Sequence, residues 1–289
     1  MRFVFPESVD ACLEALSGAG GRGRVLAGGT DLTLALRRDG EWPPVLVSLG
    51  RVREAAAIED VPGEGLRVGG AVTMEELCRS PLVATSYQAL ADAAATVGGV
   101  QIRTMATVGG NVCTASPGAD TPPALLVLGA IAEVARRGGR SRVDLTRFFT
   151  GPRRTVLDPT DVLVAFHLPP RSERSGSAYL RLTPRDALDL AVVGAAAAVT
   201  LESDCQTVAS CRVAVGAVAP TPLLMADAGE SLVGRVPDPR QLREAGERAG
   251  SSCRPITDVR GSAEYRRRMV PILVERALAL ALRRGGWQT

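Results

Sequence analysis

The chain of 289 residues contains no lysine, so all 34 of its basic residues are arginine. The absence of lysine excludes a Schiff-base lysine and the phosphate-binding lysine of a P-loop. Aromatic residues make up 3% of the chain and the formal net charge is +3. These values argue against nucleic-acid binding, which uses aromatic stacking and a strongly basic surface.

Clustered cysteines and long apolar runs are also missing. The six cysteines are scattered and form no Cys-x-x-Cys pair, so we expect neither an iron–sulfur cluster nor a structural zinc site. No run reaches about 18 apolar residues, which argues against a membrane span. Since no secretory signal opens the chain, we expect a cytoplasmic protein with free thiols. The single histidine, His167, lies in an expected strand and is interpreted as a packed or edge-strand residue.

A first glycine pair follows a short expected strand, Arg24 to Ala27. Gly28, Gly29, Thr30 and Asp31 come next, and a helix is expected from Leu32. A strand, a glycine-rich turn and a helix in this order bring the N–H groups of the helix end to a phosphate. The order matches neither the G-x-G-x-x-G fingerprint nor a Walker loop. A capped helix after a tight turn is therefore the alternative interpretation.

A second glycine pair lies in the stretch from Arg103 to Asp120, which contains Thr107, Val108, Gly109, Gly110, Asn111, Ser116 and Asp120. Paired glycines let a backbone turn sharply near a ligand. We expect exposed N–H groups in this turn to form an anion site, with further hydrogen bonds from Thr107 and Asn111. The alternative is an ordinary Gly-Gly turn between strands. Cys113 is expected to be a small packed side chain.

The remaining patterns divide the chain into two parts. Short strands, among them Val162 to Leu168, alternate with helices, one expected from Ser86 to Val97. Ser8 and Thr73 are expected helix caps. The polar run Arg171 to Ser177 predicts a linker.

Beyond the linker, the pattern predicts an antiparallel sheet followed by helices, and hence an α+β fold. The expected strands are Tyr179 to Leu182, Ala191 to Leu201 and Cys211 to Val218, and the expected helices are Leu223 to Leu232, Pro239 to Ala249 and Ala263 to Arg284. Pro271 is expected to kink or divide the last helix.

Taken together, the two glycine stretches resemble the FAD-binding subunit of the molybdenum hydroxylases. This is the medium subunit of enzymes such as xanthine dehydrogenase and aerobic carbon monoxide dehydrogenase. Three further motifs continue the resemblance: Phe148 to Pro152, Tyr179 to Leu182 and Asp258 to Arg267. The resemblance therefore covers almost the whole chain, with five motifs in a compatible order.

The resemblance implies a set of FAD-binding residues: Ala27, Gly28, Gly29, Thr30, Asp31, Leu32, Thr107, Val108, Gly109, Gly110, Asn111, Ser116, Asp120, Leu163 and Arg181. The first glycine stretch would bind the pyrophosphate through N–H groups, and the second would reach a phosphate and the ribityl chain. Asp120 would bind a cofactor hydroxyl, and Leu163 would lie against the isoalloxazine. Arg181 stands where the family commonly has a lysine near the flavin, and arginine keeps the charge with a different geometry.

The resemblance also implies an architecture. Residues 1–172 would form an FAD-binding domain of two small α/β subdomains (the PCMH type), split near residues 55–60. Residues 177–289 would form a C-terminal α+β domain with a three- or four-stranded antiparallel sheet and a helical layer.

The implied function is electron transfer within a molybdenum hydroxylase complex. FAD would be bound noncovalently and would receive electrons from [2Fe–2S] clusters of a small subunit. Molybdopterin would lie on a large subunit, and NAD⁺ or another acceptor would take the electrons from a dimer of heterotrimers. The chain would then need no catalytic side chain and no metal of its own. Two alternatives stay open: a non-catalytic assembly partner with a degenerate FAD pocket, and a free-standing flavin oxidase.

Overall fold

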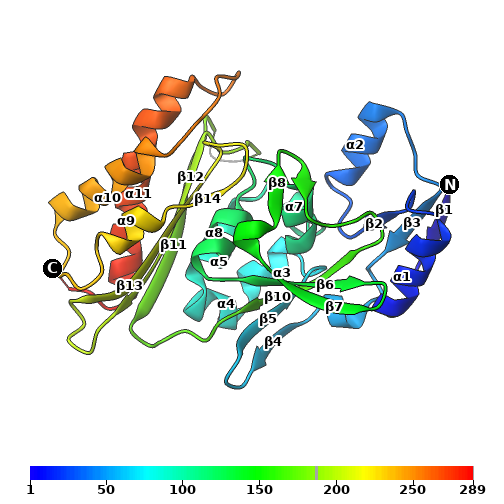
Figure 1. Ribbon diagram of the computed structural model, residues 1–289, viewed down its shortest axis with the longest axis horizontal. Coiled ribbons are helices and arrows are strands. Elements are labelled where there is room, and N and C mark those ends of the chain that lie inside the picture. The colour runs from blue at the N-terminus through cyan, green and yellow to red at the C-terminus, as the bar shows by residue number, and fades with distance from the viewer. Residues whose placement is uncertain (186–187, 289) are drawn as a thin grey trace.

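The computed structural model describes residues 1–185 and 188–288 and confirms the predicted mixture of helices with small sheets. Figure 1 shows the sheets arranged along the long axis of the molecule, with the N-terminus at one end and the last helices at the other. Within the described ranges, no helix is long and apolar enough to cross a membrane.

The first sheet consists of three parallel strands in the order β1–β3–β2. Its strands and helices are Arg2–Val4 (β1), Val9–Gly18 (α1), Arg24–Leu26 (β2), Leu32–Asp39 (α2) and Val45–Ser48 (β3). Ser8 caps α1 as predicted, because its hydroxyl accepts a hydrogen bond from the N–H of Ala11 at 3.2 Å. Helix α2 projects away from this sheet (Figure 1), and Leu36 is its one buried residue.

The second sheet consists of five antiparallel strands in the order β4–β5–β10–β6–β7. The strands are Ile58–Val61 (β4), Gly65–Gly69 (β5), Ile131–Arg136 (β6), Gly139–Asp144 (β7) and Val162–Leu168 (β10); a hairpin of Phe149–Gly151 (β8) and Arg154–Thr155 (β9) precedes β10. Strand β10 has the predicted bounds and occupies the centre of the sheet. All of its residues except His167 are buried.

Six short helices connect β5 to β6: Met74–Arg79 (α3), Pro81–Ser86 (α4), Gln88–Thr96 (α5), Val100–Arg103 (α6), Val108–Thr114 (α7) and Thr121–Val127 (α8). Thr73 caps α3 as predicted, in a capping box with Glu76. Helix α8 is buried along its whole length, since it packs against α5 and against the third sheet.

The third sheet is antiparallel, with strands Ser175–Leu182 (β11), Val193–Leu201 (β12), Val208–Gly216 (β13) and Leu223–Leu224 (β14). Helices Ala226–Glu230 (α9), Pro239–Ser251 (α10) and Ala263–Arg284 (α11) cover one of its faces, and α5 and α8 cover the other (Figure 1). Side chains alternate between the two faces of a strand. Ala196 of β12 accordingly joins the core of the second sheet, whereas Ala195 and Ala197 join the core beneath α11.

Three predicted elements differ from the structure. The helix expected from Ser86 to Val97 starts later, because the backbone leaves the helical region at Tyr87 and separates α4 from α5. The helix expected from Leu223 begins instead as β14, because Leu223 and Leu224 pair with β13. The expected linker is shorter than predicted, since β11 already begins at Ser175.

Pro271 does not divide the last helix, which runs unbroken from Ala263 to Arg284. Two glycines of α10 allow the close packing that supports it. A Cβ at Gly246 would lie 2.5 Å from the carbonyl oxygen of Pro271, and one at Gly250 would lie 3.2 Å from its ring. Small residues at these positions let the backbones of α10 and α11 approach each other.

The end of α11 ties the third sheet to the helices of the second. The guanidinium of Arg284 donates to Asp92 of α5 at 2.5 and 3.0 Å and to the carbonyl of Ser177 at 2.7 Å. Asp92 also accepts the N–H of Tyr179 at 3.0 Å. Hydrogen bonds to charged groups are stronger than neutral ones, so this cluster fixes the junction of the two parts.

Candidate functional site

The first glycine stretch forms a turn between β2 and α2 in which the backbone comes very close to another segment. A Cβ at Gly28 would lie 1.9 Å from the carbonyl oxygen of Met105, so no other residue fits without movement of the chain. Gly29 has a φ of 73°, in the left-handed region that favours glycine. The sequence Gly28-Gly29 is thus required by one close contact and one backbone angle.

The N–H groups of this turn are available to a ligand. Within the described part of the chain, no acceptor takes the N–H of any residue from Gly28 to Leu32. The next residue along the chain is Thr33, and its N–H does have an acceptor, the carbonyl of Gly29 at 3.0 Å. Five consecutive free donors at the start of a helix match the geometry by which proteins bind phosphate.

The second glycine pair does not form the exposed turn that the sequence predicts. Gly109 and Gly110 lie in the first turn of α7, and Thr107 caps this helix by accepting the N–H of Gly110 at 3.1 Å. The N–H groups of Val108, Gly109 and Asn111 donate to Val72, Gly70 and Thr107 respectively. The expectation of free N–H donors in this stretch is therefore wrong, because local capping and a contact with Gly70 already use them.

The two glycines of the second pair have different surroundings. A Cβ at Gly109 would lie 2.5 Å from the carbonyl oxygen of Gly70, whereas a Cβ at Gly110 would meet only the hydroxyl of Thr107, at 2.9 Å. Gly109 is buried and Gly110 is partly exposed. Gly109 thus permits packing, and Gly110 leaves open the space in front of α7.

The two glycine stretches lie side by side. Met105, which precedes α7, contacts Gly28 through its carbonyl. The hydroxyl of Thr114, at the end of α7, lies 2.8 Å from the Gly110 carbonyl and 3.3 Å from the carboxylate of Asp31, and its single proton can be donated to either acceptor. Residues about 80 positions apart in the sequence thus form two walls of one site.

Asn111 connects this site to α8, and Asp120 connects it to the third sheet. The Asn111 side-chain oxygen accepts the hydroxyl of Thr121 at 2.6 Å. Asp120, which is 5% exposed, accepts the Tyr179 hydroxyl at 2.7 Å and Nη1 of Arg181 at 3.1 Å. Burial raises the pKa of the Asp120 carboxyl, against the opposing charge of Arg181 and the hydrogen bonds from both residues.

The remaining predicted residues lie near these walls. Leu163 of β10 is buried, and its carbonyl lies close to Gly70, which in turn contacts Gly109. Ser116 lies in the turn between α7 and α8, where its carbonyl accepts the N–H of Ala119. Ala27 and Thr30 are partly exposed in the first turn. The contacts thus join the first glycine turn to α7 and join Asp120 to Arg181.

Sequence reasoning missed three contributors to this region. Gly70, Thr114 and Tyr179 all make contacts with predicted residues. Tyr179 belongs to a motif noted in the sequence, yet nothing there shows that its hydroxyl reaches Asp120. Gly70 is half of another glycine pair, Gly69-Gly70, which was the available signal.

His167 and Cys113 differ in how well they match their predicted surroundings. His167 lies in β10, as expected, and its Nε2 is 2.8 Å from a carboxylate oxygen of Glu133. Cys113 is exposed on α7, so the prediction of a packed side chain is wrong.

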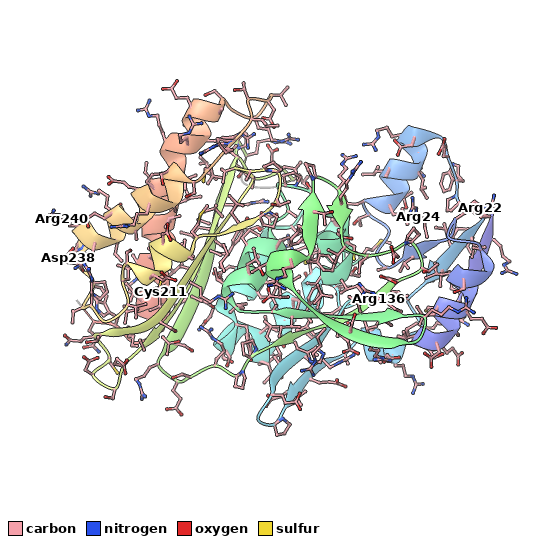
Figure 2. The ribbon with its side chains drawn as sticks, viewed as in Figure 1. Arg22, Arg24, Arg136, Cys211, Asp238 and Arg240 are labelled. Carbon is pink, nitrogen blue, oxygen red and sulfur yellow. The ribbon has the colours of Figure 1, made fainter. Side chains whose placement is uncertain are left out.

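A surface cavity of about 650 Å³ lies elsewhere, between α1 and the β6–β7 hairpin. Arg136, labelled in Figure 2, lines it and is paired with Asp161 at 3.0 Å. Arg140 on the same wall is paired with Glu54 and Glu133. Because two of its three lining arginines already have carboxylate partners, and Asp10 and Glu14 also line it, this cavity is a poorer anion site than the first glycine turn.

Comparisons with known proteins agree with the geometry. Residues 1–171 match the family described as the FAD binding domain in molybdopterin dehydrogenase. The chain belongs to this family. Residues 178–281 match the C-terminal domain of the CO dehydrogenase flavoprotein. The chain is thus an FAD-binding subunit of the oxidoreductase class formed by these dehydrogenases.

Individual relatives are similar over nearly the whole chain. A xanthine dehydrogenase FAD-binding subunit from Escherichia coli is 30% identical over 91% of this chain and 90% of the relative. The carbon monoxide dehydrogenase medium chain of Hydrogenophaga pseudoflava is 30% identical over 96% of this chain and 95% of the relative. A solved structure of carbon monoxide dehydrogenase from the same organism superposes with a TM-score of 0.93 at 29% identity, covering 98% of both chains.

Proposed function

We propose that this flavoprotein holds FAD between the turn of Ala27 to Leu32 and helix α7. The free N–H groups of Gly28 to Leu32 would bind the pyrophosphate, and they are the observation that carries the proposal. Gly28 supports it, because its missing Cβ lets the turn lie directly against Met105. Backbone donors suit a phosphate whatever the side chains around it.

The other wall would contribute side chains rather than N–H groups. The Thr107 hydroxyl, which caps α7, and the Asn111 amide nitrogen would reach the ribityl chain. Val108 and Gly109 would shape that wall, and Gly110 would leave room for the cofactor. Ser116 and Asp120 would add hydrogen bonds to cofactor hydroxyls. Leu163 would pack against the isoalloxazine, with Arg181 as the nearby cation.

The bound cofactor would accept electrons and pass them on, and the protein would hold it in place. We propose that the electrons come from [2Fe–2S] clusters of a small subunit and leave to NAD⁺ or another acceptor. A large subunit would carry the molybdopterin, and the assembly would be a dimer of heterotrimers in the cytoplasm. The similarity to medium chains and FAD-binding subunits of such dehydrogenases supports these partners.

We propose domain limits that follow the sheets. Residues 1–172 would form the FAD-binding domain, divided near residues 55–60, between the first sheet and strand β4. Residues 177–289 would form the C-terminal domain. The change from the second to the third sheet between β10 and β11 supports the limit near residue 175.

Purification of the chain together with its co-expressed partner subunits tests the cofactor. A yellow complex that releases noncovalently bound FAD on denaturation is expected. A colourless complex that cannot be reconstituted with FAD would contradict the proposal and favour an assembly partner with a degenerate pocket. Bleaching of the flavin by a small-molecule substrate in the isolated chain would instead indicate a free-standing oxidase.

A further inference from the structure

Tyr179 is held at both ends beside the proposed flavin site. Its backbone N–H donates to Asp92 of α5 at 3.0 Å, and its hydroxyl donates to Asp120 at 2.7 Å. The residue is 2% exposed. It therefore connects β11 to two helices of the FAD-binding domain, and its ring has little freedom to move.

A glycine on the neighbouring strand makes room for this hydroxyl. Gly194 of β12 pairs with Arg181 of β11. A Cβ at Gly194 would lie 2.6 Å from the Tyr179 hydroxyl oxygen. Any larger residue there would push the phenol away from Asp120, so the hydrogen bond depends on a specific feature of the sheet.

The charges in this buried cluster are arranged around Asp120. Burial raises the pKa of the Tyr179 phenol well above its ordinary value, so the hydroxyl stays a proton donor throughout the neutral range. Burial also raises the pKa of Asp120, whereas the charge of Arg181 and the hydrogen bond from Tyr179 lower it. The tyrosine thus favours the ionised carboxylate that Arg181 needs as its partner.

Arg181 makes its described contacts through one nitrogen. Nη1 donates to the Asp120 carboxylate and to the carbonyl of Asp189, each at 3.1 Å. The Arg181 side chain is 6% exposed, and a planar guanidinium keeps its other donors in a fixed direction once one nitrogen is held. The position of Asp120 therefore sets the orientation of the whole cation.

We propose that Tyr179 is a positioning residue for the flavin site. Its hydroxyl holds Asp120 as a carboxylate directed at Arg181 and thereby fixes the charge and orientation of the Arg181 guanidinium. The inference rests on the proposed FAD site, and it assigns to Tyr179 and Gly194 a role in tuning that site from the C-terminal domain.

Protonation of the Asp120 carboxyl depends on the charged groups that surround it. Tyr179 and Arg181 act on it directly, from β11. The Asp189 carboxylate lies behind Arg181, directed to Arg185 at 3.3 Å and Arg260 at 3.8 Å. Loss of the tyrosine hydroxyl would raise the pKa of Asp120, and its protonation would leave Arg181 without a neutralising charge.

The test is Tyr179→Phe in the full chain, purified with its partner subunits. The FAD dissociation constant is expected to rise about tenfold, as for the loss of a hydrogen bond to a charged group. The flavin midpoint potential and absorption spectrum should acquire a pH transition that the unaltered protein lacks in the same range. Relative to the unaltered protein at the same pH, the potential of the variant should be higher on the acid side, since an unbalanced cation favours the reduced, more negative flavin.

Two further variants make the test specific. Tyr87→Phe is the matched control, because Tyr87 is also buried and its hydroxyl donates to the Pro169 carbonyl at 3.0 Å, away from the site. It should lower stability without changing the FAD constant or the pH profile. Asp120→Asn mimics the protonated state and should give the raised potential at every pH, with no transition.

The possible outcomes distinguish the positioning role of Tyr179 from the proposed FAD-binding function. A Tyr179→Phe protein that behaves like Tyr87→Phe, less stable but with unchanged affinity and no pH transition, would overturn the positioning role. An unaltered complex that binds no FAD would instead overturn the proposed function itself.

Discussion

The two glycine pairs of this flavoprotein look alike in sequence and have different surroundings. In the turn of Gly28 and Gly29 the N–H groups are free, whereas in the helix start of Gly109 and Gly110 every N–H has an acceptor. A glycine pair therefore indicates close approach of backbones and does not by itself indicate a phosphate site. The hydrogen-bond state of the surrounding N–H groups distinguishes the two cases.

Gly28→Ala is expected to have the largest effect. The new methyl group would lie 1.9 Å from the Met105 carbonyl oxygen, so the turn must move away and its donors lose their alignment. The FAD dissociation constant should rise at least about tenfold, which corresponds to roughly 1.4 kcal/mol, and FAD occupancy should fall with it. Flavin content per mole of purified protein measures this. Full occupancy would show that the turn does not bind the pyrophosphate.

Gly109→Ala should act mainly on stability. Its methyl group would lie 2.5 Å from the Gly70 carbonyl oxygen in a buried contact. Overpacking of this kind costs about 1–3 kcal/mol, which urea unfolding of the purified protein would report. An unchanged unfolding midpoint together with lost flavin would reverse the roles assigned to the two glycines of this pair.

Gly110→Leu is expected to reduce FAD occupancy several-fold while the fold is retained. The side chain would extend into the open space in front of α7, where only the Thr107 hydroxyl lies within 4 Å of the new Cβ. Flavin content and a thermal unfolding curve, measured together, separate the two effects. Unchanged flavin content would count against the placement of the cofactor beside α7.

Thr114→Val should have the smallest effect, because it removes a single hydroxyl, which donates either to the Gly110 carbonyl at 2.8 Å or across the two walls to Asp31 at 3.3 Å. A loss of about 0.5–1.5 kcal/mol in stability or FAD binding is expected. Isothermal titration with FAD would measure it. Thr85→Val is the matched control, since the Thr85 hydroxyl bonds only within and beside α4.

Local patterns in the sequence predicted the elements whose limits depend on nearby residues. Strand β10 and helix α11 have the predicted bounds, because an apolar run and the Ser262 cap define them locally. Strand β14 was missed, since Leu223 and Leu224 become a strand only by pairing with β13. The sequence shows apolar residues there but not the pairing partner.

The contacts within the candidate site also depend on distant residues that local sequence patterns do not show. The resemblance selected the candidate residues, whereas the state of their polar groups depends on distant partners. The Gly109 N–H is used by Gly70, which follows β5. Asp120 is paired with Tyr179 and Arg181, 59 and 61 positions away. Such contacts arise from tertiary packing, which periodicity and spacing do not encode.

The contact made by Arg284 has a consequence for the order in which the molecule is completed. This residue is the last of α11, yet it binds Asp92 and Ser177 at the junction of the two domains. Domains fold largely in the order of synthesis, N-terminal first. The FAD-binding domain can therefore collapse on the ribosome, but its final attachment to the C-terminal sheet must wait for the last turns of α11. A chain truncated before Arg284 would lack that attachment entirely.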